Sequence, residues 1–479
     1  MNRIVRSVLH ALEEAGYEAY LVGGAVRDIL MQREPHDYDV TTSARPEEIR
    51  AVGAAQGWHT VEINSERFGI VVLVVDGMTI ETATFRGEAY GADSHRPASV
   101  WYADTLREDV LRRDFTVNAL AMDQYGTVYD YVGGQKDLHK KRLVTVGDAT
   151  RRFTEDALRL FRACRFTGQL GFIPDKTMLR AMPAAFYRVQ GLSLERVVQE
   201  IDRLMLTPEV SKGLDVLVRS GLGACSCRQK ENGVYREVPI LPELSHLPET
   251  PQSRPFHVFD AWFHTLAAVA HTPADLTIRY AMLFHDVAKG LPGIRGIHKG
   301  RFTDYGHDNK GAEIATAILT RWGKRPAFVQ RVAWLVQTHM KFHYYANTGE
   351  GDLAKWLRHE ALQGPFRRTD ELTDAVEQAT AVAVGDIWGC GRTEANTQGT
   401  EEFGRFMADL ARAMPVSTKD LHYDRRLTMQ CGKETGACLH NLLQRVQNGQ
   451  LENDPDVLYE AAEKWLKRQG EKNHEDQTR

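Results

Sequence analysis

The pattern of hydrophobic and polar positions divides the chain into a mixed N-terminal part and a longer helical part. Up to about residue 145, apolar runs typical of strands alternate with helical stretches; the runs are YLVGG, GIVVLVV, MTIETATF and VYDYVGG. From Asp148 to about Leu206, and again from His257 to about Cys390, apolar residues recur at helical spacing. We therefore predict an α+β fold, in which a mixed sheet with helices is followed by helical domains.

Two further segments bear on the domain organisation and on the location of the protein. A region rich in Ser and Pro, roughly Arg228 to Pro255, predicts loop and linker. The start, MNRIVRSVLHALEEAG, is helix-like but interrupted by charge, unlike a secretory signal. No stretch is apolar over a length that spans a bilayer. We expect a cytoplasmic protein without a membrane partner, and the length of 479 residues predicts two to four domains.

Composition and charge narrow the class of ligand. With 43% hydrophobic and 26% charged residues, the chain has an ordinary globular composition. Its six cysteines, including Cys225 and Cys227, give neither a disulfide framework nor a paired zinc signature. The net charge of −4 argues against indiscriminate nucleic-acid binding. Positive charge is nevertheless concentrated between Arg107 and Arg165, so we expect the first third of the chain to meet an acidic ligand.

The first candidate site is a glycine turn. Tyr20 to Val22 reads as a strand, Gly23-Gly24 as a turn and Ala25 to Met31 as the start of a helix. Such a turn lets backbone N–H groups approach phosphate oxygens, and Arg27 could add a fork-shaped donor. On its own, a Gly-Gly turn is more often structural.

Two aspartates follow the turn. In a strand, Asp37 and Asp39 would point to the same face. Two carboxylates held together repel unless a divalent cation neutralises them, and Mg²⁺ suits carboxylates combined with substrate phosphates. An isolated D-x-D is more often a solvated acidic turn, but beside a phosphate cradle it predicts a two-metal nucleotidyl-transfer site. Glu81, in a strand-like run, is a candidate third carboxylate.

Several motifs together resemble the class II tRNA nucleotidyltransferases and bacterial poly(A) polymerases, in the polymerase-β-like superfamily. They are Gly23-Gly24, Val26-Arg27-Asp28 and Asp37-Tyr38-Asp39, then LRRDFTVNALAMD from Leu111, EDALRLFRACRF from Glu155 and SLERVVQE from Ser193. The resemblance implies a polymerase-β-like nucleotidyltransferase head that uses Mg²⁺. It also implies that Arg113 contacts nucleotide phosphates and that Asp114 and Asn118 organise the site.

The EDALRLFR segment suggests how a base is read without a template. Asp156 and Arg159 lie three apart on a predicted helix, so they share a face. A carboxylate accepts from an exocyclic amino group while a guanidinium donates to ring acceptors, which admits CTP and ATP and disfavours GTP and UTP. Arg162 and Arg165 follow at the same spacing and would bind triphosphate or RNA backbone. The structural alternative is a salt-bridged surface helix.

Residues 86–100 occupy the position of the family's flexible loop, which is linked to the switch from C to A addition. His95-Arg96 stands where the family commonly has its two basic residues in the other order, and Tyr90 is displaced. The loop keeps its length, so we expect A addition to be retained.

A second cluster follows the H…HD…D order of HD-type phosphohydrolases, which some members of the family carry. Its members are His264, His285, Asp286 and Asp386. Mixed imidazole and carboxylate ligands suit Mn, Ni, Zn or Fe without discriminating among them. His307 and His339 are possible additional ligands or phosphate contacts.

These observations predict five segments and one activity. The segments are a nucleotidyltransferase head (1–145), an all-helical neck with the nucleotide-selecting helix (146–210), a linker or helical connection (211–256), an HD domain (257–390) and a helical RNA-binding tail (391–479). We expect template-independent addition of CCA to the 3′ end of tRNA from CTP and ATP. The alternatives are a CC-adding or A-adding partial enzyme, a poly(A) polymerase, or, in a different class, an HD metal-dependent phosphohydrolase. The sequence does not predict the oligomeric state.

Overall fold

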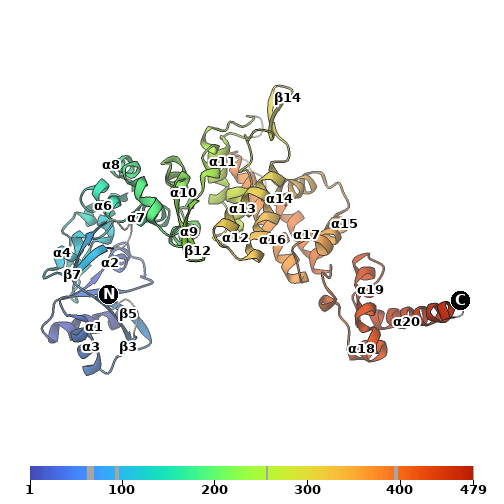
Figure 1. The fold of residues 1–479 in the computed structure, drawn as a ribbon, viewed down its shortest axis with the longest axis horizontal. Coiled ribbons are helices and arrows are strands. Elements are labelled where there is room, and N and C mark those ends of the chain that lie inside the picture. The colour runs from blue at the N-terminus through green and yellow to red at the C-terminus, as the bar shows by residue number, and fades with distance from the viewer. Residues whose placement is uncertain (62–68, 92–96, 255–256, 393–396, 478–479) are drawn as a thin grey trace. The chain divides into compact units, whose positions relative to one another are not determined.

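The computed structural model describes residues 1–61, 69–91, 97–254, 257–392 and 397–477. The chain forms two compact units, residues 1–245 and 246–479 (Figure 1). This division does not test the boundaries of the five segments, which stay predictions. Among the described residues, no helix combines the length and the apolar character needed to cross a membrane.

The first unit contains a seven-stranded sheet with the order β3-β4-β5-β2-β1-β8-β9. Neighbouring strands are antiparallel except β2 and β5, which run parallel. The strands are β1 (Ala19–Val22), β2 (Asp39–Thr42), β3 (His59–Val61), β4 (Ile70–Val75), β5 (Met78–Thr84), β8 (Ala121–Met122) and β9 (Val128–Tyr129). A mixed sheet with helices confirms the predicted architecture of the head.

One face of this sheet packs against helices α1 (Arg3–Glu14) and α3 (Pro46–Ala55). The apolar residues of α1 recur at helical spacing and are fully buried; they are Val5, Val8, Leu9 and Leu12. Each such side chain contributes roughly 1.5–3 kcal/mol on burial. Val40 of β2 joins this core. Because side chains alternate along a strand, its neighbours Asp39 and Thr41 face the opposite side, away from the core.

Residues 86–100 differ from the flexible loop that the sequence predicts. They contain two antiparallel strands, β6 (Arg86–Tyr90) and β7 (Pro97–Tyr102). The hairpin leads into α4 (Leu106–Leu111), whose first turn is capped by the hydroxyl of Thr105. His95 and Arg96 lie outside the described residues, so the expectation about A addition stays a prediction.

The segment predicted as an all-helical neck, residues 146–210, is mainly helical but contains the short strand β11 (Ile173–Pro174), which pairs in parallel with β10 (Arg142–Leu143). Its α-helices are α6 (Ala149–Glu155), α7 (Leu158–Leu170), α8 (Lys176–Ala181) and α9 (Leu194–Met205), and α10 (Val210–Arg219) follows in the predicted linker or helical connection. The prediction of a loop and linker from Arg228 to Pro255 is wrong as far as Pro239, because β12 (Ser226–Glu231) and β13 (Val234–Pro239) form an antiparallel hairpin. Asn232 and Gly233 join them with φ values of 48° and 85°, the geometry of a tight two-residue hairpin turn.

The second unit is mainly helical, with one short hairpin. Its elements are α11 (Ala261–Ala270), α12 (Leu276–Phe284), β14 (Arg295–His298), β15 (Arg301–Asp304), α13 (His307–Arg321), α14 (Pro326–Thr348), α15 (Leu353–Gln363), α16 (Thr369–Gly389), α17 (Gln398–Arg412), α18 (Arg425–Cys431), α19 (Thr435–Gln447) and α20 (Pro455–Gln477). Helices α11, α12, α14 and α16 pack against one another and carry the polar cluster described below.

Candidate active site and metal centre

The sheet places two candidate carboxylates side by side. Strand β2 begins at Asp39, and in its parallel pairing with β5 the Cα of Asp39 lies opposite that of Glu81. Residues opposite each other on neighbouring strands point to the same face. Glu81 is therefore the neighbour of Asp39 in the structure.

Asp37 lies just before the strand. The prediction that both aspartates share one strand is wrong, because β2 starts only at Asp39. Removal from water raises the pKa of Asp39, and Glu81 and Asp37 raise it further, against the lowering effect of Arg113. A divalent cation would offset the cost of ionising Asp39 beside two other carboxylates, so Asp37, Asp39 and Glu81 fit Mg²⁺.

Gly23 brings the turn against this acidic group. It follows β1 directly, and Val22 is paired with Asp39. Its φ is 75°, and a Cβ built on it would lie 3.2 Å from Nη1 of Arg113 and 3.9 Å from Oδ2 of Asp39. Gly24 begins helix α2 (Gly24–Leu30), so the predicted strand, turn and helix are all present. The backbone of the turn, Arg113 and Asp39 thus meet at one place.

Arg27 lies next to the glycine turn and is bound by protein side chains. It is 3% exposed. Its Nη1 donates to Oδ1 of Asn118 at 2.6 Å, and its Nε donates to Oδ1 of Asp28 at 2.9 Å. The guanidinium of Arg113 lies beside Asp39, while that of Arg27 is bound by Asn118 and Asp28, so phosphate binding by Arg27 stays a prediction.

Arg162 and Arg165 are also bound by carboxylates. Arg162 donates to Oδ2 of Asp114 from Nε at 2.8 Å, with Nη2 at 2.6 Å, and Arg165 donates to Glu200 of α9 at 2.6 Å. Burial alone would raise the pKa of Asp114, but Arg162 lowers it to about 2. These ion pairs tie α7 to the head and to α9, whereas the sequence predicts contacts with triphosphate or RNA.

Asp156 and Arg159 are adjacent but do not share one continuous helix. Asp156 lies between α6 and α7, where its Oδ1 accepts from the N–H of Leu158 at 2.9 Å, so the predicted single helix is wrong. Its Oδ2 is 4.0 Å from Nε of Arg159. Arg159 also donates to the carbonyl oxygens of Arg112 at 3.0 Å and Arg152 at 3.1 Å. The carboxylate of Asp156 and the guanidinium of Arg159 therefore lie side by side, and each is held in its orientation by backbone hydrogen bonds.

In the second unit, the four residues of the H…HD…D pattern come together. His264 on α11 has its Nε2 3.0 Å from Nε2 of His285 and 3.0 Å from Oδ1 of Asp386, which lies on α16. Asp286 directs Oδ2 at both imidazoles, 3.3 Å from each. His264, His285 and Asp286 are at most 1% exposed.

The charges of this cluster suit a metal ion. Burial would lower the pKa of His285, but Asp286 and Asp386 raise it to about 9. Burial would likewise raise the pKa of Asp386, and the histidines hold it well below its usual value. A buried set of imidazoles and carboxylates with converging ligand atoms fits a divalent transition metal.

Four further side chains lie close to this cluster that the sequence did not predict as site residues. His343 places Nε2 2.8 Å from Oδ2 of Asp386, and Lys289 places Nζ 2.7 Å from Oδ2 of Asp286. Ligand atoms of His257 and Cys390 lie within 4.8 Å of each other and of one from His264. Only Lys289 had a local signal, because it follows the His-Asp pair within the same HDVAKG turn.

Three stretches of the chain match known protein domains. Residues 19–144 match the poly A polymerase head domain, 171–224 the probable RNA and SrmB-binding site of polymerase A, and 260–375 the HD domain. The CCA-adding enzyme of Bacillus pumilus is 39% identical over 55% of this chain and 62% of that protein. That of Geobacillus sp. is 43% identical over 45% and 52%. The chain thus matches between half and two thirds of these relatives' length.

The same likeness holds in three dimensions. The crystal structure of the Bacillus stearothermophilus CCA-adding enzyme in complex with CTP superimposes with a TM-score of 0.65 and 25% identity, covering 99% of this chain and 100% of that one. These similarities agree with the order of the domains and with the glycine turn that lies beside the paired carboxylates. The chain carries the poly A polymerase head domain in its first unit and an HD domain in its second, and it is similar to proteins named CCA-adding enzymes.

Proposed function

We propose that the chain adds C, C and A to the 3′ end of tRNA without a template, using CTP and ATP and releasing pyrophosphate. The observation that carries this proposal is the meeting of Asp39, Glu81 and Arg113 at the Gly23 turn. Nucleotidyl transfer requires a cation site next to a phosphate site, and this place offers both. The similarity to proteins named CCA-adding enzymes supports the choice of tRNA, CTP and ATP. Because tRNA is processed there, we place the protein in the cytoplasm.

In the proposed reaction, the 3′-hydroxyl oxygen of the tRNA attacks the α-phosphorus of the nucleotide. The new O–P bond forms as the bond to the β-phosphate bridge breaks, and pyrophosphate leaves. Asp37, Asp39 and Glu81 would hold Mg²⁺, which when bound supplies activation of the hydroxyl and neutralises charge on the leaving group. Arg113 and the backbone N–H groups of Gly23 and Gly24 would hold the triphosphate.

Base selection would fall to the pair between α6 and α7. Asp156 accepts from the exocyclic amino group of cytosine or adenine, and Arg159 donates to the ring acceptor beside it. The contacts of Arg159 with two backbone carbonyls hold its guanidinium in place before a nucleotide arrives. Arg162 and Arg165 would assist by fixing helix α7 through their own ion pairs.

The HD cluster favours a second activity in the same chain, the metal-dependent hydrolysis of a phosphate ester. His264, His285, Asp286 and Asp386 would hold a Mn, Ni, Zn or Fe ion, which when bound supplies a Lewis acid for the phosphoryl oxygen. The burial of these ligands beside an open cavity supports this candidate.

A gel assay of nucleotide addition tests the transferase proposal. The protein is given Mg²⁺ and labelled CTP or ATP with tRNAs that end before the first C, after CC and after CCA. Addition of two Cs and one A, with no further growth, is the expected result. Addition of A alone or of CC alone would indicate a partial enzyme, and long A tracts a poly(A) polymerase.

The control is Asp39→Asn, which keeps the shape of the side chain and removes its charge. It should abolish incorporation on every acceptor. If the wild-type protein incorporates nothing, or if Asp39→Asn incorporates as much as wild type, the transferase proposal is refuted.

A further inference from the structure

We propose that the hairpin of β14 (Arg295–His298) and β15 (Arg301–Asp304) is a docking element for single-stranded RNA. Bases stack on its exposed apolar and aromatic side chains, while the cations at its tip contact phosphates. This surface belongs to the second unit and requires no metal ion. It is independent of the site proposed for nucleotide addition in the first unit.

The hairpin turns tightly and projects from the helices around it. The last pair before the turn is His298 with Arg301, so only Lys299 and Gly300 join the two strands. These two residues have φ values of 50° and 73°, the left-handed geometry of a two-residue turn that matches the twist of the strands. Figure 1 shows the hairpin, marked by the label β14, extending away from the helices of the second unit. Its tip is therefore open to a ligand.

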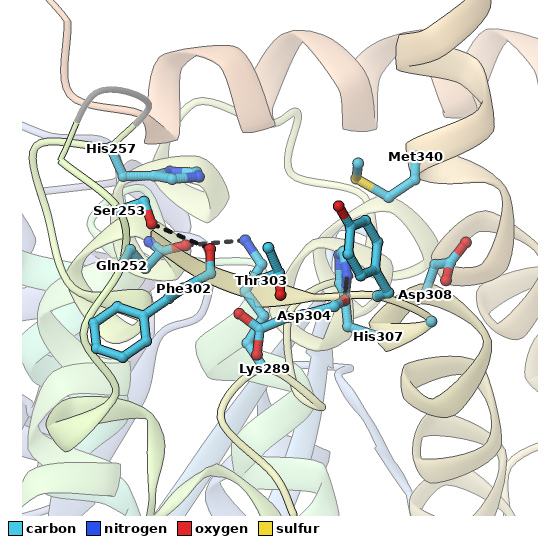
Figure 2. A pocket seen from close by; sticks show the side chains of 12 residues that line it. Gln252, Ser253, His257, Lys289, Phe302, Thr303, Asp304, His307, Asp308 and Met340 are labelled. Carbon is cyan, nitrogen blue, oxygen red and sulfur yellow. Dashed lines mark hydrogen bonds between the residues drawn. The ribbon is translucent and has the colours of Figure 1, made fainter. Parts of the chain in front are cut away.

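The base of the hairpin is anchored to the rest of the unit. Nε of Arg295 donates to Oδ1 of Asp304 at 2.8 Å, and Nη1 of Arg295 donates to the carbonyl oxygen of Pro251 at 3.0 Å. The hydroxyl of Ser253 donates to the carbonyl oxygen of Phe302 at 3.1 Å, a contact drawn in Figure 2. These bonds hold both strands in place before a ligand arrives, so binding requires little further ordering of the chain.

One face of the hairpin exposes apolar groups. Ile297 and Phe302 are opposite each other in the register, so their side chains point to the same face. They are 72% and 41% exposed, and Tyr305, directly after β15, is 79% exposed. Cζ of Arg295 lies 4.7 Å from the centre of the Phe302 ring. Aromatic rings and guanidinium planes are the groups on which unpaired bases stack.

The tip of the hairpin carries positive charge that no acid neutralises. Lys299 and Arg301 are both exposed, and neither forms an ion pair with any residue that the structure describes. The one carboxylate of the hairpin, that of Asp304, is paired with Arg295 at its base. His298 at the end of β14 is exposed and adds a ring N–H donor. The tip therefore attracts a polyanion.

Rings and cations together favour single-stranded RNA over the other partners of an exposed patch. A protein partner is disfavoured, because lysine is depleted at protein interfaces. Duplex RNA keeps its bases stacked on one another, so it contacts the cations and leaves the rings exposed. An unpaired strand presents base faces and phosphates at once, and it uses both parts of this surface.

Crosslinking locates the RNA on the full chain. A short single-stranded RNA containing 4-thiouridine is irradiated with the protein, and the crosslinked peptides are identified by mass spectrometry. We expect a crosslink within residues 295–305, and a much weaker one when the same strand is presented as a duplex. Absence of a crosslink in this segment, or equal crosslinking by the duplex, overturns the proposal.

Variants separate stacking from charge. The readout is the RNA concentration that gives half-maximal protection of the 295–305 peptide from hydrogen exchange, which reports binding at the hairpin alone. Phe302→Ala combined with Tyr305→Ala should raise this midpoint about tenfold or more. Lys299→Ala combined with Arg301→Ala should raise it by a similar factor and reduce the slope of log affinity against log salt by about 1.4, which is about 0.7 for each phosphate contact.

Two matched controls lie elsewhere in the second unit. Tyr344→Ala removes a tyrosine of α14 that is 52% exposed, and Lys355→Ala removes an exposed lysine of α15. Both should keep the midpoint within twofold of wild type. Exchange of the 295–305 peptide without RNA reports whether the hairpin is folded, and if the aromatic double variant loosens it, Phe302→Leu is read in the same way. An unchanged midpoint in either double variant, or an equal rise in the controls, overturns the proposal.

Discussion

Replacing Gly23 by Ala should damage the head far more than the same change at the adjacent Gly24. Gly23 has φ 75° and ψ −135°, a combination that residues with a side chain rarely adopt. Gly24 has no such restriction, because it begins helix α2 and is not among the residues with positive φ. The two neighbouring glycines therefore form a matched pair for one motif.

The magnitude follows from the geometry. Holding Ala in the backbone conformation of Gly23 costs about 1–3 kcal/mol. The new Cβ would also lie 3.2 Å from Nη1 of Arg113, which must then move by a few tenths of an ångström. At Gly24 the nearest atom is Nη2 of Arg27 at 3.4 Å, an ordinary contact, and Ala favours a helix by about 0.5–1 kcal/mol. Gly23→Ala should therefore destabilise the head, and Gly24→Ala should leave its stability equal or slightly higher.

Local hydrogen exchange is the appropriate assay. The chain has two compact units, so a single free energy of unfolding is not defined for it. Exchange measured by mass spectrometry on peptides covering residues 19–42 reports the opening free energy of the head alone. Displacement of Arg113 should also lower kcat/KM for CTP in Gly23→Ala by about 100-fold. Equal losses of stability in the two variants, or no loss in Gly23→Ala, would refute the reasoning.

Three further outcomes follow from the contacts. Glu81→Gln should raise the Mg²⁺ concentration for half-maximal CTP incorporation roughly tenfold or more, because one carboxylate beside Asp39 is lost; an unchanged Mg²⁺ titration would contradict this. The pKa of Asp114, about 2 in the fold against about 3.9 unfolded, makes its ionised form stabilise the head by about 2–3 kcal/mol above pH 4. That contribution is lost as the pH falls from about 4 through 2, so the difference between wild type and Asp114→Asn in the opening free energy of the head, measured by hydrogen exchange, should shrink over this range. Chelation should lower the calorimetric midpoint of the second unit by several degrees in wild type but not in Asp386→Asn, since bound metal stabilises only the folded state.

The pattern of hydrophobic and polar residues predicted most of the helices and strands. It failed for strands whose side chains are mainly exposed. The apolar run GIVVLVV became β4, and the periodic segments after Asp148 became helices. The hairpin of β12 and β13 carries mostly polar and exposed residues, so no apolar alternation identified it. The Asn232-Gly233 pair was the available signal, because that dipeptide favours a tight hairpin turn.

For the candidate sites too, the sequence predicted some features and could not predict others. The H…HD…D order predicted four residues that meet in space, because each ligand type was recognisable in the sequence. The pairing of Asp39 with Glu81 depends on the register of two parallel strands far apart in the chain, which no local pattern specifies. For the same reason the sequence could not show that Arg27 and Arg162 are bound by carboxylates and amides of distant segments.

The buried carboxylate of Asp109 explains how Arg113 comes to lie beside Asp39. Asp109 is fully buried on α4, and Nη2 of Arg113 lies 3.3 Å from its Oδ2. The same Oδ2 accepts from the hydroxyl of Thr41 at 3.4 Å, and Thr41 stands two residues after Asp39 on the same face of β2. One carboxylate thus connects Arg113, the proposed phosphate contact, to the strand that carries Asp39, the proposed Mg²⁺ ligand. Helix α4 and strand β2, which are distant in sequence and carry residues of the proposed nucleotide site, are thereby held together by a buried residue that has no proposed contact with nucleotide or metal.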